Sequence, residues 1–167
     1  MTRTNTHKIL DTAAQGLALY AALLLWPFAF GKLAGDPSAL QGMRQIALHF
    51  GADPTLLRYA LGIQEALVIL GLAAGSFAFV GPRFSRLQRV ARLGAVLGGL
   101  GLGLTMGGAL ATEFIVRPGE QAWLVDLALK LMVFGTVVAA WAVHRFRPQR
   151  EVASAVERTT LRPLAAR

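Results

Sequence analysis

The stretch QAWLVDLALKLMVFGTVVAAW, residues 121–141, decides the fold of this chain. An α-helix needs about 20 mostly apolar residues to cross ~30 Å of hydrocarbon, and this stretch is that long. It also carries Asp126 and Lys130, which are four positions apart and therefore share one helix face. The stretch predicts a membrane-spanning helix with a polar site or a polar contact inside it.

Three other stretches have the same character, at residues 10–32, 56–80 and 90–113. Only 16% of the 167 residues are charged, whereas soluble domains average roughly 25%. We predict an all-α integral membrane four-helix bundle with antiparallel up-down spans. Residues 1–146 would form this single bundle, and residues 147–167 a basic, partly disordered tail.

A short amphipathic segment lies between the first and second predicted spans. Met43, Ile46, Ala47 and Phe50 follow the i, i+3, i+4, i+7 spacing of one helix face. Asp-Pro pairs stand on both sides of this segment, and such pairs favour turns. We predict a short external helix that lies on the membrane surface or folds over the bundle.

The basic residues indicate the orientation of the chain. Twelve of them lie at the termini and in the connection after the second span: Arg3, Lys8, Arg83, Arg86, Arg89, Arg92, Arg145, Arg147, Arg150, Arg158, Arg162 and Arg167. By the positive-inside rule, both termini are cytoplasmic in a bacterial-type inner membrane. Because topology explains the net charge of +8, we expect no nucleic-acid partner.

Cofactor chemistry is restricted by composition. The chain has no cysteine, which excludes disulfides, thiol exchange and a cysteine-held iron–sulfur cluster within this chain. Its three histidines, His7, His49 and His144, lie at or outside the predicted span ends, and no metal-ligand spacing is visible. We expect no metal and no covalently bound cofactor.

The third span is rich in glycine. Gly94 and Gly98, and likewise Gly99, Gly103 and Gly107, have the small-xxx-small spacing that lets membrane helices approach closely. This pattern favours a tightly packed position at the centre of the bundle. Contact with another copy of the chain is the alternative.

Ionisable residues inside the spans are the candidate functional groups. Glu65 and Lys130 each lie nine positions into a span that starts outside, so both sit roughly 13 Å below the outer boundary. A charge at such depth is costly unless it is partnered, and it often marks a functional site. We predict a Glu65–Lys130 pair, with Asp126 and Arg58 extending it outward. The alternative is a pair that only fixes which helices meet.

Three charges near the outer span ends have a simpler reading. Lys32, Arg58 and Glu113 are expected to extend their polar groups to the lipid headgroups. Lys32 and Arg58 nevertheless remain candidates for the ligand or proton site, because Arg58 shares a helix face with Glu65 two turns away and Lys32 ends the first span on the same outer side.

The segments FGKLAGDP (residues 30–37) and FGADPTLLRYALGIQEALVILGLAAG (residues 50–75) resemble the DoxX family of small four-helix membrane proteins. Lys32 and Glu65 are the two polar residues that match family positions. The resemblance implies a subunit of a membrane oxidoreductase assembly that works with quinone or partner enzymes. Relatives often have a histidine near the end of the third helix, where this chain has Thr112-Glu113.

These observations lead to one functional hypothesis with two alternatives. The hypothesis is an oxidoreductase-complex subunit, not an enzyme on its own, with an outward polar pocket for quinone, a proton or a small ligand. The alternatives are a small proton-coupled transporter that uses Glu65, and a scaffold or lipid-interacting protein without chemistry. Partner subunits, the lipid bilayer and a second copy of the chain are the expected partners.

Overall fold

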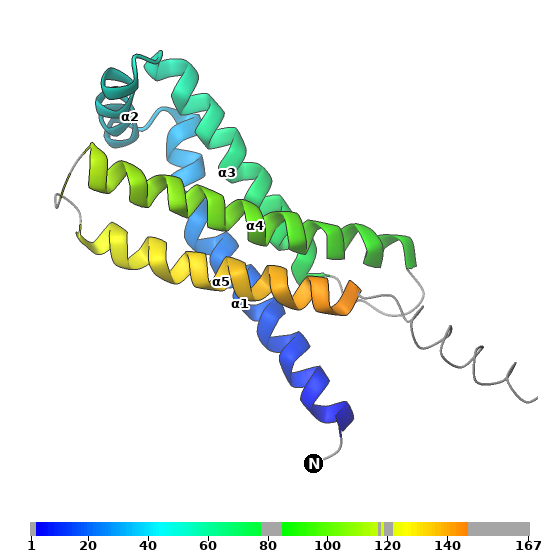
Figure 1. Ribbon diagram of the computed structural model, residues 1–167. Coiled ribbons are helices and arrows are strands. Elements are labelled where there is room, and N and C mark those ends of the chain that lie inside the picture. Colours follow the sequence, from blue (N-terminus) through cyan, green and yellow to red (C-terminus); the bar gives the residue numbers. More distant parts are fainter. Residues whose placement is uncertain (1–2, 78–84, 117, 119–121, 147–167) are drawn as a thin grey trace, which may run out of the picture.

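The computed structural model describes residues 3–77, 85–116, 118 and 122–146. The described residues form five α-helices and no strand (Figure 1). The helices are α1 (Arg3–Ala34), α2 (Pro37–Phe50), α3 (Pro54–Ser76), α4 (Ser85–Ile115) and α5 (Ala122–Phe146). The predicted tail, residues 147–167, lies outside the described residues.

Four of the helices are long and apolar enough to cross a membrane. The candidate spans are Lys8–Ala34, Pro54–Ser76, Gln88–Ile115 and Ala122–His144. Within the described residues, the prediction of an all-helical fold with four apolar helices long enough to cross a membrane is therefore confirmed.

Helices α2 and α3 begin with the same local signal. Asp36 accepts a hydrogen bond from the backbone N–H of Ser38 at 2.8 Å, and Asp53 accepts one from Leu56 at 2.7 Å. Each aspartate is followed by proline, whose fixed φ suits the first helical position. The preceding helices end at Gly35 and Gly51, whose φ angles of 81° and 65° are left-handed. Together, these residues set the two corners that place α2 between α1 and α3.

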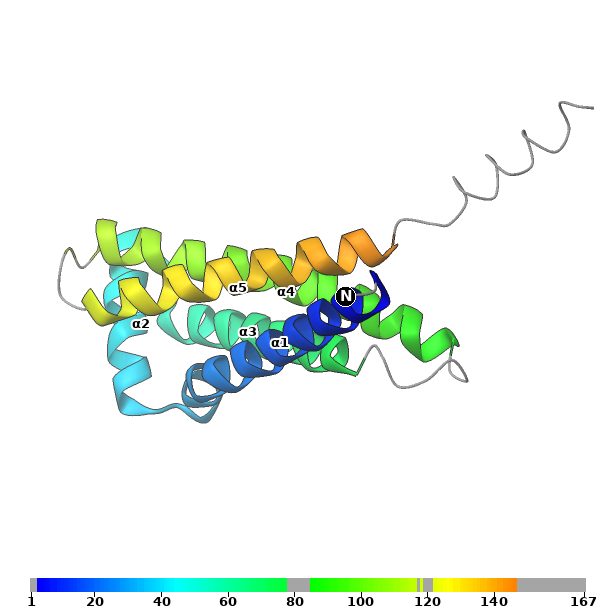
Figure 2. The same ribbon diagram turned by 90° about the horizontal axis from the view of Figure 1, so that it is seen from below.

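The four long helices pack through a core of small and aliphatic side chains. Helix α4 contacts both α3 and α5, and α1 contacts the same two helices (Figures 1 and 2). The core residues include Ala18, Ala21, Leu25, Ala29, Leu72, Ala95, Leu102, Leu131, Val138 and Ala142. Alanine dominates the buried side of α1, so the α1 backbone can approach its neighbours closely.

Glycine allows backbone contact on two sides of α4. A Cβ added to Gly98 would lie 2.6 Å from the backbone nitrogen of Leu72, and one added to Gly99 would lie 2.6 Å from the carbonyl oxygen of Gly135. One added to Gly94 would lie 3.0 Å from the carbonyl oxygen of Gly71. These glycines occupy the central packing position that their spacing indicated.

Gly103 and Gly107, the last two glycines of the predicted stripe, have open space beside them. A Cβ added to Gly103 or Gly107 would meet nothing within 4 Å. A Cβ added to Gly135 of α5 would nevertheless lie 3.3 Å from the backbone nitrogen of Gly103, so the Gly103 backbone packs against α5 although the space where its own Cβ would stand is open.

Candidate functional site

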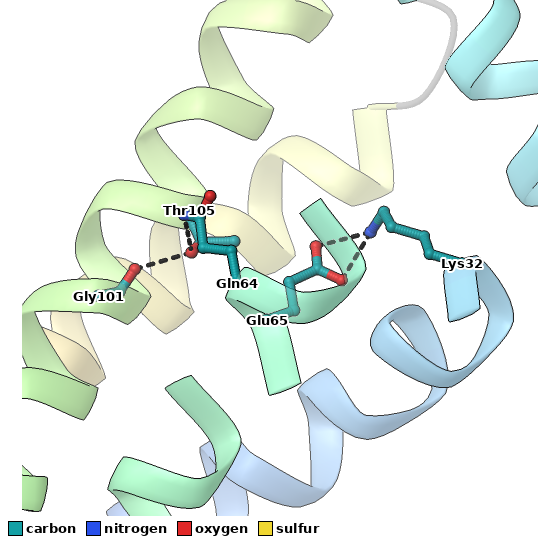
Figure 3. Close-up of polar contacts among 5 residues, drawn as sticks. All are labelled: Lys32, Gln64, Glu65, Gly101 and Thr105. Carbon is teal, nitrogen blue, oxygen red and sulfur yellow. Dashed lines mark hydrogen bonds and ion pairs between the residues drawn. The ribbon is translucent and has the colours of Figure 1, made fainter. Parts of the chain in front are cut away.

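An ion pair links the last turn of α1 to the interior of α3. The Lys32 ammonium nitrogen lies 2.6 Å and 2.7 Å from the two carboxylate oxygens of Glu65 (Figure 3). The side chains of Lys32 and Glu65 are only 13% and 7% exposed. Lys32 thus donates hydrogen bonds to both oxygens of a carboxylate that is shielded from solvent. Hydrogen bonds between two charged groups are stronger than those between neutral groups.

The predicted pair between Glu65 and Lys130 is wrong. Lys130 instead lies 2.5 Å from Asp126 on its own helix, and these side chains are 60% and 65% exposed. Lys130 therefore projects away from the bundle. The buried positions of α5, such as Gly135 and Ala142, lie on another face, roughly 120–140° around the helix from Lys130.

Arg58 extends the buried polar site around Lys32. Its guanidinium NH1 donates to the backbone carbonyl of Lys32 at 2.7 Å, and its central carbon lies 4.1 Å from the Tyr59 ring centroid. That carbonyl belongs to the last turn of α1, where helix carbonyls lack partners within the helix. A cation there also complements the negative end of the helix dipole.

One hydrogen-bond donor of Arg58 is left over. Arg58 is 7% exposed, and its Nε is buried without a hydrogen-bond partner among the described residues. Buried donors are satisfied in the large majority of cases, and leaving one unpaired costs roughly 1–3 kcal/mol. The Nε of Arg58 is therefore a candidate donor to a ligand oxygen.

The expectation that the outer charges reach headgroups is wrong for two residues. Arg58 is 7% exposed and Glu113 is 4% exposed, so both are buried. Lys32 is largely covered as well, because its ammonium turns inward to Glu65. In this position the Lys32 ammonium compensates the charge of the Glu65 carboxylate. A buried carboxylate without a partner costs more free energy than an exposed lysine without one.

Helix α2 lies beside this polar site. It contacts α1 and α3, and Figures 1 and 2 place it at the same end of the bundle as the last turns of α1 and α4. Met43, Ile46 and Ala47 are buried as their spacing predicted, whereas Phe50 is 61% exposed. We call this region the α2 end of the bundle.

The start of α2 holds a perturbed carboxylate. Asp36 accepts hydrogen bonds from both the hydroxyl and the backbone N–H of Ser38. These bonds favour the charged form and hold the pKa of Asp36 below its ordinary value of 3.8. The cap on α2 is therefore charged at neutral pH.

Two further polar contacts join the spans, and the sequence pattern did not indicate either. Gln64 donates to the Thr105 hydroxyl at 3.0 Å, and Thr105 donates to the Gly101 carbonyl at 2.8 Å (Figure 3). The Trp141 indole of α5 donates to the Asp11 carboxylate of α1 at 3.0 Å. The spacing of residues within one helix cannot predict these contacts, because each helix contains only one of the two partners.

The donor set does not point to a metal. Within the described part of the chain, no group of three or more His, Cys, Asp and Glu side chains is placed to hold a metal ion. The polar site instead offers an ammonium, a guanidinium and one carboxylate. Such a set can donate hydrogen bonds to a carbonyl or anionic oxygen, and its carboxylate can take up a proton.

Comparison with known proteins adds no relative. The chain matches no protein-family model, no curated protein and no solved structure.

Proposed function

We propose that this chain is a DoxX-like multi-pass protein of a bacterial-type cytoplasmic membrane and serves as a subunit of a membrane oxidoreductase assembly. Four apolar helices and the unequal distribution of arginine support this placement. In the proposed orientation the spans run antiparallel, both termini are cytoplasmic, and α2 lies on the external side.

The Lys32–Glu65 pair is the observation that carries this proposal. These two residues match DoxX family positions and are 33 positions apart in the chain, yet their charged groups are in direct contact. A chance likeness of two short motifs would not require their polar residues to meet. The contact thus supports a shared architecture in which this pair is the central polar feature.

The proposed ligand of this polar site is a quinone or a similar oxygen-bearing molecule. The unpaired Arg58 Nε is a donor that a ligand carbonyl would satisfy, and the NH1 of the same guanidinium holds the backbone carbonyl of Lys32, whose ammonium binds Glu65. When bound, a quinone would supply electron and proton transfer, which this cysteine-free chain lacks in its own side chains.

The chain's own residues would bind the ligand and handle one proton. Arg58 would hold a ligand oxygen through Nε, while its NH1 stays on the Lys32 carbonyl and keeps the guanidinium in place. Lys32 would donate to the same or a neighbouring oxygen. Glu65 would then lose its ion-pair partner, and uptake of a proton at its carboxylate would remove the buried charge.

Isolation of the intact assembly tests this function. The protein would be extracted from its native membrane in mild detergent and analysed by mass spectrometry for partner chains and bound small molecules. We expect redox-enzyme subunits to accompany the wild type. Recovery of the chain with lipid alone would contradict the proposal.

A proton-coupled transporter is the second candidate, favoured by the burial of the Glu65 carboxylate within a candidate span. In that case Glu65→Gln would abolish uptake in proteoliposomes, while the exposed change Leu67→Ala on the same helix would not. Unchanged uptake in Glu65→Gln would eliminate this candidate.

A further inference from the structure

Helix α5 carries an ion pair on the outside of the bundle. Asp126 and Lys130 are 65% and 60% exposed, although they belong to the candidate span Ala122–His144. Lys130 lies eight positions after Ala122 and, among the described residues of the four candidate spans, is the exposed charge furthest from a span end. Charged groups at this depth in a membrane normally face protein or water and not lipid.

The rotation of α5 is fixed by its buried side. Ala128, Leu131, Gly135, Val138 and Ala142 alternate three and four positions apart and are all buried. This heptad-like spacing defines one continuous packed face. The ion pair cannot turn into this bundle without turning that face out, so its surroundings must come from another molecule.

Below the ion pair, the same outer face is built of small and β-branched residues. Val133, Val137 and Ala140 are exposed and continue the stripe that starts at Asp126 and Lys130. By contrast, the exposed positions of α3 carry larger side chains such as Ile63, Leu67 and Leu70. Small residues at an exposed helix face are typical of contacts between membrane helices.

We propose that this face of α5, defined by Asp126, Lys130, Val133, Val137 and Ala140, is the interface with a second copy of the chain. Two copies in one membrane have the same orientation, so a two-fold axis along the membrane normal brings equal depths together. Helix side chains tilt toward the N-terminus, and therefore Lys130 of each copy reaches up to Asp126 of the other. The four charges then form one closed cluster.

Charge complementarity favours a second copy over other occupants. The face presents one positive and one negative group, so it complements itself without any further residue. An anionic lipid headgroup would engage Lys130 but would be repelled by Asp126. This inference rests on the membrane placement of α5 and is independent of the Lys32–Glu65 site.

Disulfide cross-linking tests the interface directly, because the natural chain has no cysteine. Val137→Cys would be introduced into the full chain and oxidised in native membranes. The matched control is Leu70→Cys, which is exposed on α3 and lies 16 positions from the start of its helix, against 15 for Val137. We expect a cross-linked dimer of the chain for Val137→Cys and no such dimer for Leu70→Cys.

A charge-reversal experiment separates the ion cluster from general apolar contact. In the Val137→Cys background, Asp126→Lys alone and Lys130→Asp alone each place like charges across the interface, so the cross-link should be lost. Co-expression of the two variants with different tags should restore it as a mixed dimer, because the two chains are then complementary. Restoration also shows that both variants fold.

Each outcome decides the proposal. A Val137→Cys dimer together with the mixed dimer supports the interface. Equal cross-linking of Val137→Cys and Leu70→Cys, or cross-linking of Val137→Cys only to a different protein, overturns it. So does a Val137→Cys dimer that persists unchanged after Asp126→Lys.

Discussion

Lys32 and Glu65 join the end of α1 to the interior of α3, with the ammonium 2.6 Å and 2.7 Å from the two carboxylate oxygens. The contact also connects the two segments that carry the family resemblance. Arg58 binds the carbonyl of the same Lys32, so a single residue of α1 holds both charged groups of α3. This arrangement makes the α2 end of the bundle a buried polar site.

Removing one partner of this pair should destabilise the fold. Lys32→Met or Glu65→Gln leaves the other group buried without compensation, and we expect each to lower the free energy of unfolding by about 3–5 kcal/mol. The double variant should lose less than the sum of the two. Unfolding in detergent micelles measures the cycle, with the exposed change Leu67→Ala as control. Additive losses would mean that the two side chains are not coupled.

The glycines of α4 should differ sharply in their tolerance of a methyl group. Gly98→Ala places a Cβ 2.6 Å from the Leu72 backbone nitrogen, so the helices must separate, at an expected cost of about 1–3 kcal/mol. Gly107→Ala meets nothing within 4 Å and should leave stability unchanged or slightly raised. Thermal unfolding of both variants provides the comparison, and equal effects would contradict the close packing of α3 on α4.

The turn after α1 should be sensitive for two separable reasons. Gly35→Ala and Gly51→Ala each force alanine into a left-handed conformation, at roughly 1–2 kcal/mol. The Gly35 change also places a Cβ 3.0 Å from the Arg58 NH1, whereas the Gly51 change meets nothing within 4 Å. We expect Gly35→Ala to cost more, and the difference to disappear in an Arg58→Met background. A difference that persists there would show that Arg58 is not responsible.

Acid should loosen the start of α2. Because hydrogen bonds from Ser38 lower the pKa of Asp36, its contribution is complete above the ordinary value of 3.8 and is lost as the pH falls through the lowered pKa. Amide exchange in α2 should therefore increase in strong acid. Asp36→Asn keeps a capping oxygen but does not titrate, so it should lack this change. The same acid response in both proteins would assign it to another group.

The span count and the α2 stripe could be predicted from the sequence, because hydropathy and helical spacing report length and amphipathicity directly. Met43, Ile46 and Ala47 are buried as expected. Phe50 is exposed because it ends the helix beside Gly51, where the face no longer lies against the bundle.

The partner of Glu65 could not be predicted in the same way. The position of a residue along a span predicts its depth in the membrane. By predicted depth, Lys130 was as suitable an ion-pair partner for Glu65 as any other residue. Hydropathy gives little information on the rotation of a helix that is apolar on most of its sides, so hydropathy alone did not indicate that Lys130 faces outward. The alternating spacing of Leu131, Gly135, Val138 and Ala142 was the available signal, and it becomes decisive only when small residues are read as packing positions.

The most direct test of the central claim is the amount of quinone retained by the purified chain. The Lys32→Met/Glu65→Gln double variant removes both charges together, so it avoids a lone buried charge and leaves Arg58 in place. A matched Asp126→Asn/Lys130→Gln variant removes the exposed pair instead. The account predicts that the wild type and the exposed-pair variant retain extractable quinone and that the buried-pair variant loses it. Equal retention in all three proteins, or none in the wild type, would contradict a ligand site at Lys32, Arg58 and Glu65.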